Sequence, residues 1–219
     1  MTAHEHRAWS RGSYAQAMYA PQPALPLSLC DAEGWCLPLD LERWRARADA
    51  GDRTVLGRCT GRVLDIGCGS GRLVEELAGR GGHVLGIDVC PSAVITTVCR
   101  GGMAMSRSVF DPLPDEGRWG TALLLDGNIG IGGDPRRLLR RVRDLVHQEG
   151  LLLVETAAAD VDQRRRVRIH AGRRPVSAVF PWDTVGTEAL SRHAVSEGWR
   201  EAERWSAGGR YFVALRAND

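Results

Sequence analysis

Three glycines at alternate positions, Gly67, Gly69 and Gly71, follow the apolar run at residues 63–66. Glycine lets the chain turn tightly and brings bare backbone against a ligand. A carboxylate, Asp65, interrupts the apolar run two residues before the first glycine. Because a buried carboxylate is costly unless it is hydrogen-bonded or paired with positive charge, this turn is expected to face a small ligand that carries positive charge.

A second carboxylate, Asp88, ends the next apolar run at residues 83–87. An acidic residue about twenty positions after a glycine-rich first turn accepts both hydroxyls of a ribose. A dinucleotide fingerprint has the spacing G-x-G-x-x-G, whereas this chain reads G-x-G-x-G and places Arg72 where the last glycine belongs. A nicotinamide-dependent oxidoreductase is therefore the less favoured alternative.

The acidic residue followed by G-x-G-x-G resembles the first motif of class I S-adenosylmethionine (SAM) dependent methyltransferases. The resemblance implies S-adenosyl-L-methionine as cofactor. It also implies a bacterial small-molecule enzyme, and the absence of lysine among 29 basic residues is typical of a GC-rich, actinobacterial genome. The cofactor-binding residues that it implies, including the two alternatives for the adenine end, are Asp65, Gly67, Cys68, Gly69, Gly71, Asp88, Val89, Ser108, Val109, Asp111, Asp126 and Gly127.

The contact to the adenine amino group has two candidates. Members of the family usually place an acidic residue after the third strand, often shortly before Leu-Pro, and Asp111 precedes Leu113 and Pro114 in this way. Ser108 fits the end of the strand better, and it would bind adenine through a neutral hydrogen bond together with the backbone of Val109. Both candidates stay open at this stage.

The chemistry is expected at the glycine-rich loop after residues 121–125, which carries Asp126 and Asn128. Methyl transfer is an in-line displacement that depends on alignment, and a base is needed only when the nucleophile is protonated. Asp and Asn in such a loop also make ordinary backbone turns, so a structural role is equally open. His193 is a further catalytic candidate, and His170 and Tyr14 are alternative bases.

The elements that must position these residues alternate between strands and helices. Strands are expected at 63–66, 83–88, 103–109, 121–125 and 151–155, with a helix after each of the first two and another opened by Asp134 and Pro135. This alternation predicts a parallel α/β sheet whose ligand lies beyond the carboxyl ends of the strands. The resemblance adds a Rossmann-like, seven-stranded, mostly parallel sheet with helices on both faces and an antiparallel last strand.

The end of the chain departs from this alternation. Residues 167–170 and 176–180 flank a turn and are expected to form a short hairpin, followed by a helix at 187–197 and two strands at 200–205 and 210–215. The SAM-binding domain is placed at residues 61–219.

Residues 1–60 are expected to form an N-terminal extension, with one helix at 41–47 and a proline-rich stretch at 21–26. In members of the family such an extension often forms a lid. The aromatic candidates for a lid are Tyr14, Tyr19, Trp35 and Trp44, and simple packing of these rings is the alternative.

Composition narrows the class of protein. The chain has 219 residues and 43% hydrophobic content, and it holds nothing near the roughly 20 apolar residues of a membrane span. The net charge of +2 argues against bulk nucleic-acid binding. Six cysteines without C-x-x-C or histidine spacing are expected to be reduced thiols of a cytoplasmic protein, with no metal site.

The sequence therefore predicts a SAM-dependent methyltransferase that acts on an oxygen or nitrogen atom of a small molecule. A non-catalytic SAM-binding regulatory or partner protein is the alternative with the same cofactor motif. No nucleic-acid or membrane partner is expected, and the sequence gives no indication of the oligomeric state.

Overall fold

Seven strands form the central sheet of the computed structural model, which describes residues 25–218. The order is β11-β12-β7-β6-β3-β4-β5. Strands β5, β4, β3, β6 and β7 are parallel, and β12 runs antiparallel to β7. Their bounds are β3 Val63–Ile66, β4 Val84–Asp88, β5 Ala104–Ser106, β6 Trp119–Leu124, β7 Val146–Thr156, β11 Trp199–Ala207 and β12 Arg210–Ala217.

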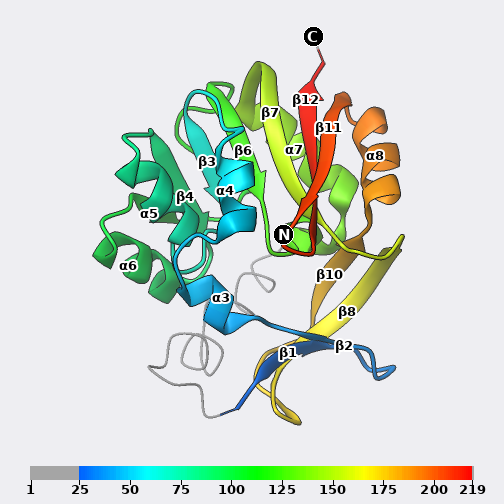
Figure 1. The fold of residues 1–219 in the computed structure, drawn as a ribbon. Helices are drawn as coiled ribbons and strands as arrows, with labels where there is room; N and C mark the ends of the chain where they lie inside the picture. The colour runs from blue at the N-terminus through cyan, green and yellow to red at the C-terminus, as the bar shows by residue number, and fades with distance from the viewer. Residues whose placement is uncertain (1–24, 219) are drawn as a thin grey trace.

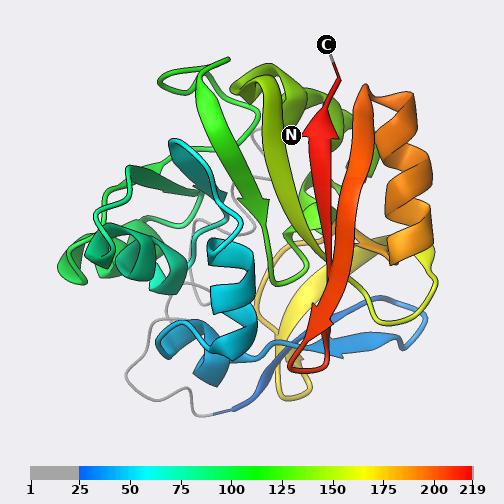
Figure 2. The ribbon, with the colours of Figure 1, turned by 45° about the horizontal axis from the view of Figure 1, so that its top comes forward.

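Helices cover both faces of this sheet (Figures 1 and 2). On one face, α7 and α8 pack their apolar side chains against β6, β7 and β12. On the other, α4 and α5 pack against β3 and β6, and α6 lies beside β4 and β5. The helices are α3 Leu41–Arg45, α4 Ala50–Leu56, α5 Arg72–Gly79, α6 Pro91–Cys99, α7 Pro135–Leu145 and α8 Thr187–Ser196.

Local sequence explains where α7 begins and which face it buries. The Asp134 side chain accepts a hydrogen bond from the amide of Arg137 at the helix start, and Pro135 occupies the first turn, as expected for a capped helix. Leu138, Leu139 and Val142 recur on one face and are fully buried. The predicted strands, helices and antiparallel last strand are thus confirmed, with ends shifted by a few residues.

A second sheet lies at one end of the molecule, below the seven-stranded sheet in Figure 1. Its order is β10-β8-β1-β2, with β9 paired to β8. Strand β1 lies between β2 and β8, so segments more than a hundred residues apart in the chain join one sheet. The strands are β1 Leu27–Cys30, β2 Cys36–Pro38, β8 Asp162–Ala171, β9 Arg174–Pro175 and β10 Phe180–Val185.

The antiparallel pairing predicted for residues 167–180 is confirmed. The strands are longer than predicted, and they belong to this second sheet. Strand β8 begins at Asp162, and its register with β10 pairs Val167 with Phe180. Helix α3 falls within the predicted 41–47 helix, whereas α4 was not expected. Tyr14, Tyr19 and residues 21–24 of the proline-rich stretch lie outside the described residues.

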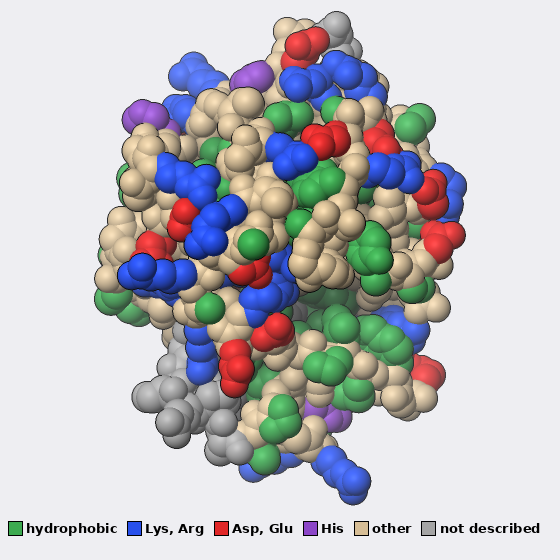
Figure 3. Space-filling model, viewed as in Figure 1, with side chains coloured by type: hydrophobic (Ala, Val, Ile, Leu, Met, Phe, Trp, Pro, Cys, Tyr) green, Lys and Arg blue, Asp and Glu red, His purple; other side chains and the backbone are tan. Residues whose placement is uncertain are grey.

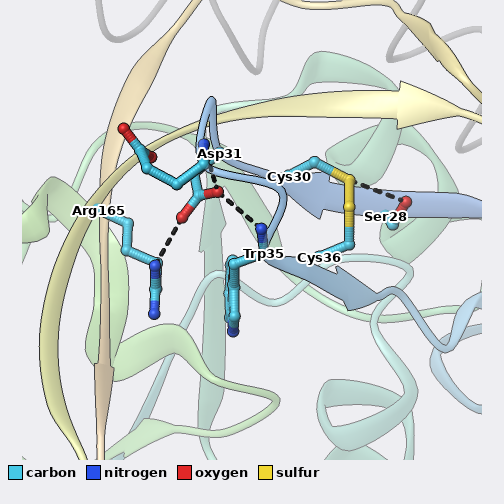
Figure 4. The surroundings of a disulfide bond; sticks show 7 residues. Ser28, Cys30, Asp31, Trp35, Cys36 and Arg165 are labelled. Carbon is cyan, nitrogen blue, oxygen red and sulfur yellow. Dashed lines mark hydrogen bonds and ion pairs between the residues drawn. A yellow bond between two sulfur atoms is a disulfide. The ribbon is translucent and has the colours of Figure 1, made fainter.

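The expectation of six reduced cysteines is wrong for one pair. Cys30 and Cys36 are directly opposite each other in the antiparallel β1–β2 register and form a disulfide with an S–S distance of 2.03 Å (Figure 4). A search for C-x-x-C misses this pair because five residues separate the two cysteines, while a hairpin places them face to face. Cys59, Cys68, Cys90 and Cys99 are free thiols, and a cytoplasmic location stays a prediction.

No helix within residues 25–218 is long and apolar enough to cross a membrane.

Candidate active site

A cavity of about 350 Å³ lies between the carboxyl ends of the central strands and the inner face of the second sheet. Figure 3 shows hydrophobic side chains gathered where the two sheets meet. The predicted site residues that line this cavity are Gly67, Cys68, Gly69, Asp88, Val89, Ser108, Val109, Asp126, Gly127 and Asn128. The predicted residues outside its lining are Asp65, Gly71, Asp111 and His193.

The glycine turn presents backbone to the cavity. Gly67 and Gly69 have left-handed φ values of 75° and 54°, which favour glycine. A Cβ atom added at Gly69 would meet nothing within 4 Å, so the space beside this glycine is open to a ligand. Gly71 differs, because a Cβ atom there would lie 2.5 Å from Thr97 Oγ1, and this glycine instead permits α5 and α6 to pack closely.

Asp88 lies at the end of β4 with both carboxylate oxygens directed by backbone donors. Oδ2 accepts from the amide of Gly69 at 3.0 Å, and Oδ1 accepts from the amide of Cys90 at 2.8 Å. Burial raises the pKa of Asp88, and these backbone hydrogen bonds act in the opposite direction. Each oxygen keeps a second lone pair, so the carboxylate can also accept the two hydroxyls of a ribose.

Asp65 is buried within β3 and has an orphaned oxygen. Its Oδ2 makes no hydrogen bond within the described part of the chain. Burial raises the pKa of Asp65 to about 7; the charge of Arg72 acts to lower it, and Asp126 and Asp88 raise it further. A carboxyl group in this position favours a positively charged group nearby, which fits the ammonium and sulfonium groups of SAM.

Cys68 fills space in the turn. Its side chain is buried, and a Cβ atom on Gly86 of β4 would lie 2.7 Å from its sulfur. Burial raises the pKa of this thiol well above its usual value, with Asp88 and Asp65 adding to the shift. The thiol is therefore protonated, as expected for a small buried residue.

The structure separates the two adenine candidates. Ser108 is buried and lines the cavity together with Val109. Asp111 is absent from the lining, and its carboxylate accepts a hydrogen bond from the amide of Ser108 at 3.1 Å. Asp111 thus holds the backbone of Ser108, and only Ser108 and Val109 are placed for contact with a ligand.

Asp126 follows β6 with a left-handed φ of 58°. Its Oδ2 accepts from Arg72 at 2.6 Å, and its Oδ1 lies 2.7 Å from a guanidinium nitrogen of Arg43 in α3. This arrangement ties the N-terminal segment to the loop after β6. Arg210 also lies 3.5 Å from the carboxylate, so the geometry favours an anchoring role. A role of Asp126 in orienting the acceptor or the SAM amino group, as a base or as an ammonium partner, stays a prediction.

Asn128 holds the two loops of the site together. Its Nδ2 donates to the carbonyl oxygens of Ile66 at 2.9 Å and Gly67 at 3.1 Å. A Cβ atom on Gly67 would lie 2.6 Å from this nitrogen. Asn128 therefore fixes the glycine turn against the loop after β6.

Further charged residues extend from Asp126, and sequence reasoning missed them. Arg72 forms two hydrogen bonds with Asp52 of α4, at 2.9 and 3.0 Å, while Arg210 of β12 contacts Asp52 at 2.8 Å. Burial alone would raise the pKa of Asp52, but both arginines outweigh it and hold this pKa well below its usual range. Arg210 also donates two hydrogen bonds to Glu155 of β7, at 2.9 and 2.7 Å, and lies 3.5 Å from Asp126.

The sequence contains little that could have predicted these contacts among charged residues. Asp49 and Asp52 have the spacing of a helix capping box, which they form, but nothing in that spacing shows that Asp52 becomes fully buried. We refer to Arg43, Arg72, Arg210, Asp52, Asp126 and Glu155 as the charge network.

His193 does not join the site. Its Nε2 lies 3.0 Å from Oδ1 of Asp162, and the residue is absent from the cavity lining. His170, the other histidine considered, also lies outside that lining, on β8 opposite Ser28.

Residues 40–185, which include both loops of the site, match the family described as "Methyltransferase domain". The chain belongs to this methyltransferase family. Among curated proteins, the ubiquinone biosynthesis O-methyltransferase of Azorhizobium caulinodans is 30% identical over 100 residues. That match covers 43% of the chain and 40% of the relative, so the chain spans less than half of the relative's length.

Solved structures of methyltransferases share the fold. The SAM-dependent methyltransferase of Bacteroides fragilis, in complex with S-adenosylhomocysteine, has a TM-score of 0.75 at 21% identity and covers 100% of this chain and 98% of its own. The 1,6-didemethyltoxoflavin-N1-methyltransferase of Burkholderia thailandensis, with its acceptor and S-adenosylhomocysteine bound, has a TM-score of 0.56 at 18% identity, covering 76% and 75%. The Rossmann-like fold predicted for this methyltransferase family member is confirmed.

Proposed function

We propose that the protein transfers a methyl group from SAM to an oxygen or nitrogen atom of a small molecule. The observation that carries this proposal is one continuous cavity, which runs from Gly69 and Asp88 past the Asp126 loop to the inner face of the second sheet. SAM supplies an electrophilic methyl group when it is bound. The similar proteins include both an O-methyltransferase and an N1-methyltransferase, which supports either acceptor atom.

In this proposal, different residues bind different parts of SAM. Gly69 gives backbone access, Asp88 accepts ribose hydroxyls, and Ser108 with Val109 contacts adenine. Asp65 provides the negative charge that a cationic cofactor favours. Asn128 and the charge network hold the two loops in fixed positions, which is the main requirement of an in-line displacement because alignment lowers its barrier.

The proposal is tested by incubating the protein with methyl-labelled SAM and a fractionated metabolite extract, followed by mass spectrometry of labelled products. A labelled product that requires the intact protein is the expected result. SAM binding without any labelled product would instead favour a non-catalytic SAM-binding protein, and NADH binding without SAM binding would favour the oxidoreductase.

Asp88→Ala provides the matched variant for cofactor binding. Loss of a charged acceptor for two hydroxyls is expected to weaken SAM affinity by about 1.5–3 kcal/mol, measured by calorimetry. Asp144→Ala removes an exposed carboxylate from α7 and should leave affinity unchanged. Equal affinity of the Asp88 variant and wild type would show that the ribose binds elsewhere.

A further inference from the structure

The half of the cavity away from Asp88 is apolar and aromatic. We define this acceptor half by its side chains Leu29, Leu37, Leu39, Ile131, Phe180 and Trp182. Most of them come from the second sheet, whose inner face also carries Val167 and Ile169 in the same apolar cluster. An apolar molecule gains about 25 cal/mol for each Å² that it buries here, whereas a sugar or an amino acid would leave polar groups without partners.

Aromatic side chains shape this half. The rings of Phe180 and Trp182 lie at 89° to each other with centroids 6.4 Å apart. Trp182 also lies against the glycine-rich turn η1 (Asn128–Gly133), since a Cβ atom on Gly130 would be 2.7 Å from its ring. Two perpendicular rings offer both an edge and a face to a bound molecule close to the Asp126 loop. Aromatic rings pack well in such arrangements, so the site favours a molecule with an aromatic ring.

Three acidic side chains that border the acceptor half lie near arginines. Asp126 lies 2.7 Å from Arg43, and Glu155 lies 2.7 Å from Arg210. Asp183 lies 3.5 Å from Arg164, although neither of its carboxylate oxygens has a hydrogen bond within the described residues. Strand alternation places its side chain on the face opposite Trp182. Each of these charges thus has an opposite charge near it, which disfavours anionic and cationic acceptors.

The described lining also contains no His or Tyr side chain that could act as a base. An aliphatic amine is protonated near neutral pH, with a pKa near that of lysine at about 10.4, and would need such a base. An amino group on an aromatic ring is neutral at the same pH. A phenol ionises near pH 10, as tyrosine does, far more readily than an aliphatic alcohol.

We propose that the acceptor is an uncharged aromatic molecule that carries its reacting hydroxyl or amino group on the ring. This inference rests on the proposed methyl transfer and specifies its substrate class. The ring lies between the second sheet and η1, and the reacting atom loses its proton to water, so no protein base is required. The oxygen or nitrogen forms the new bond to the methyl carbon as the bond from that carbon to sulfur breaks.

The test compares matched acceptors on the full-length protein loaded with S-adenosylhomocysteine for binding and with methyl-labelled SAM for turnover. The probes are 2-naphthol, its saturated analogue decahydro-2-naphthol, and the charged 6-hydroxy-2-naphthalenesulfonate. We expect 2-naphthol to bind at least tenfold more tightly than either analogue. Equal or weaker binding of 2-naphthol would overturn the inference whether or not turnover is seen, whereas loss of SAM binding would overturn the proposed function itself.

Two surface variants complete the experiment. Leu37→Asp places a charge at the rim of the acceptor half, where Leu37 is 37% exposed and tolerates substitution, and should weaken 2-naphthol binding about tenfold without changing SAM affinity. Leu25→Asp changes an exposed leucine outside the cavity lining and should have no effect. Equal naphthol affinity in both variants would move the acceptor away from the second sheet.

Discussion

The two aspartates on either side of the glycine turn have different surroundings. Asp88 has backbone donors on both oxygens, whereas Asp65 keeps an orphaned oxygen. Its neighbour Arg72 directs its donors to Asp52 and Asp126 instead. Both carboxylates are visible in the sequence, but the sequence could not show that one oxygen of Asp65 is left without a hydrogen bond, because its surroundings come from distant parts of the chain.

We expect Asp65→Asn to stabilise the cofactor-free protein at pH 8 and to weaken SAM binding. The pKa of Asp65 rises from 3.8 to about 7 on folding, so stability falls as the pH rises from about 4 to 7, where the unfolded chain loses a proton that the folded state keeps. The variant avoids this loss, a gain of about 2–4 kcal/mol at pH 8. Thermal unfolding at pH 4 and pH 8 measures it, with Asp144→Asn as control.

That prediction has a clear contrary outcome. The difference between wild type and Asp65→Asn should shrink to less than about 1 kcal/mol at pH 4, where the folded wild-type carboxyl is neutral and the unfolded one is only partly ionised. A constant difference between the two proteins at all pH values would show that Asp65 stays ionised in the fold.

Asp126→Asn tests anchoring against base catalysis. If the carboxylate anchors Arg43 and Arg72, the variant should lose about 2–4 kcal/mol of unfolding free energy, since breaking one partner of a largely buried ion pair is costly. Asp40→Asn is the control, because Asp40 is 58% exposed and lies 3.4 Å from Arg43. A tenfold to thousandfold loss of turnover at unchanged stability would restore the base role.

At the scale of elements, the β1–β2 hairpin is held by more than its disulfide. Asp31 accepts a hydrogen bond from the amide of Trp35 at 2.8 Å and from Arg165 of β8 at 2.6 Å (Figure 4). The guanidinium of Arg165 also lies 4.5 Å from the ring of Trp35. Trp35 was a candidate for a lid, with simple packing as the alternative, and the structure places it against Arg165 of β8.

The double variant Cys30→Ala/Cys36→Ala should weaken the hairpin by about 2 kcal/mol, the chain-entropy contribution of closing so short a loop. Faster hydrogen exchange of β1 and β2 amides would show this, with the central strands unchanged and SAM affinity retained. If these amides exchange at the wild-type rate, the contacts of Asp31 and Arg165 are enough to hold the hairpin without the disulfide.

The whole molecule depends on pairing across distant segments. The central sheet was predictable because each βαβ unit is local in sequence. Its strands are short continuous apolar runs, and Pro91 and the Asp134–Pro135 pair mark the starts of two of its helices. The second sheet was not, because β1 and β8 pair through backbone hydrogen bonds that leave no local pattern. The charge network has the same limitation, since Arg43, Asp52 and Arg210 meet only after the chain folds.

Removing residues 1–40 tests the predicted lid at this scale. The deletion takes away β1 and β2 and leaves the edge of β8 that pairs with β1 without a partner strand, while the central sheet keeps its pairing. We expect SAM affinity within about threefold of wild type and KM for the acceptor at least tenfold higher. Wild-type steady-state kinetics would rule out a lid, and loss of cooperative unfolding would show that the segment is structural.

The second sheet also sets an order of events during synthesis. Strand β1 leaves the ribosome early, but its partner residues in β8 include Arg168, which pairs with Cys30. Synthesis proceeds at about 5–20 residues per second, so β8 follows β1 after a delay on the order of ten seconds. During this interval Leu27 and Leu29 form an uncovered edge, so the nascent chain is open to chaperone binding or aggregation until β8 emerges.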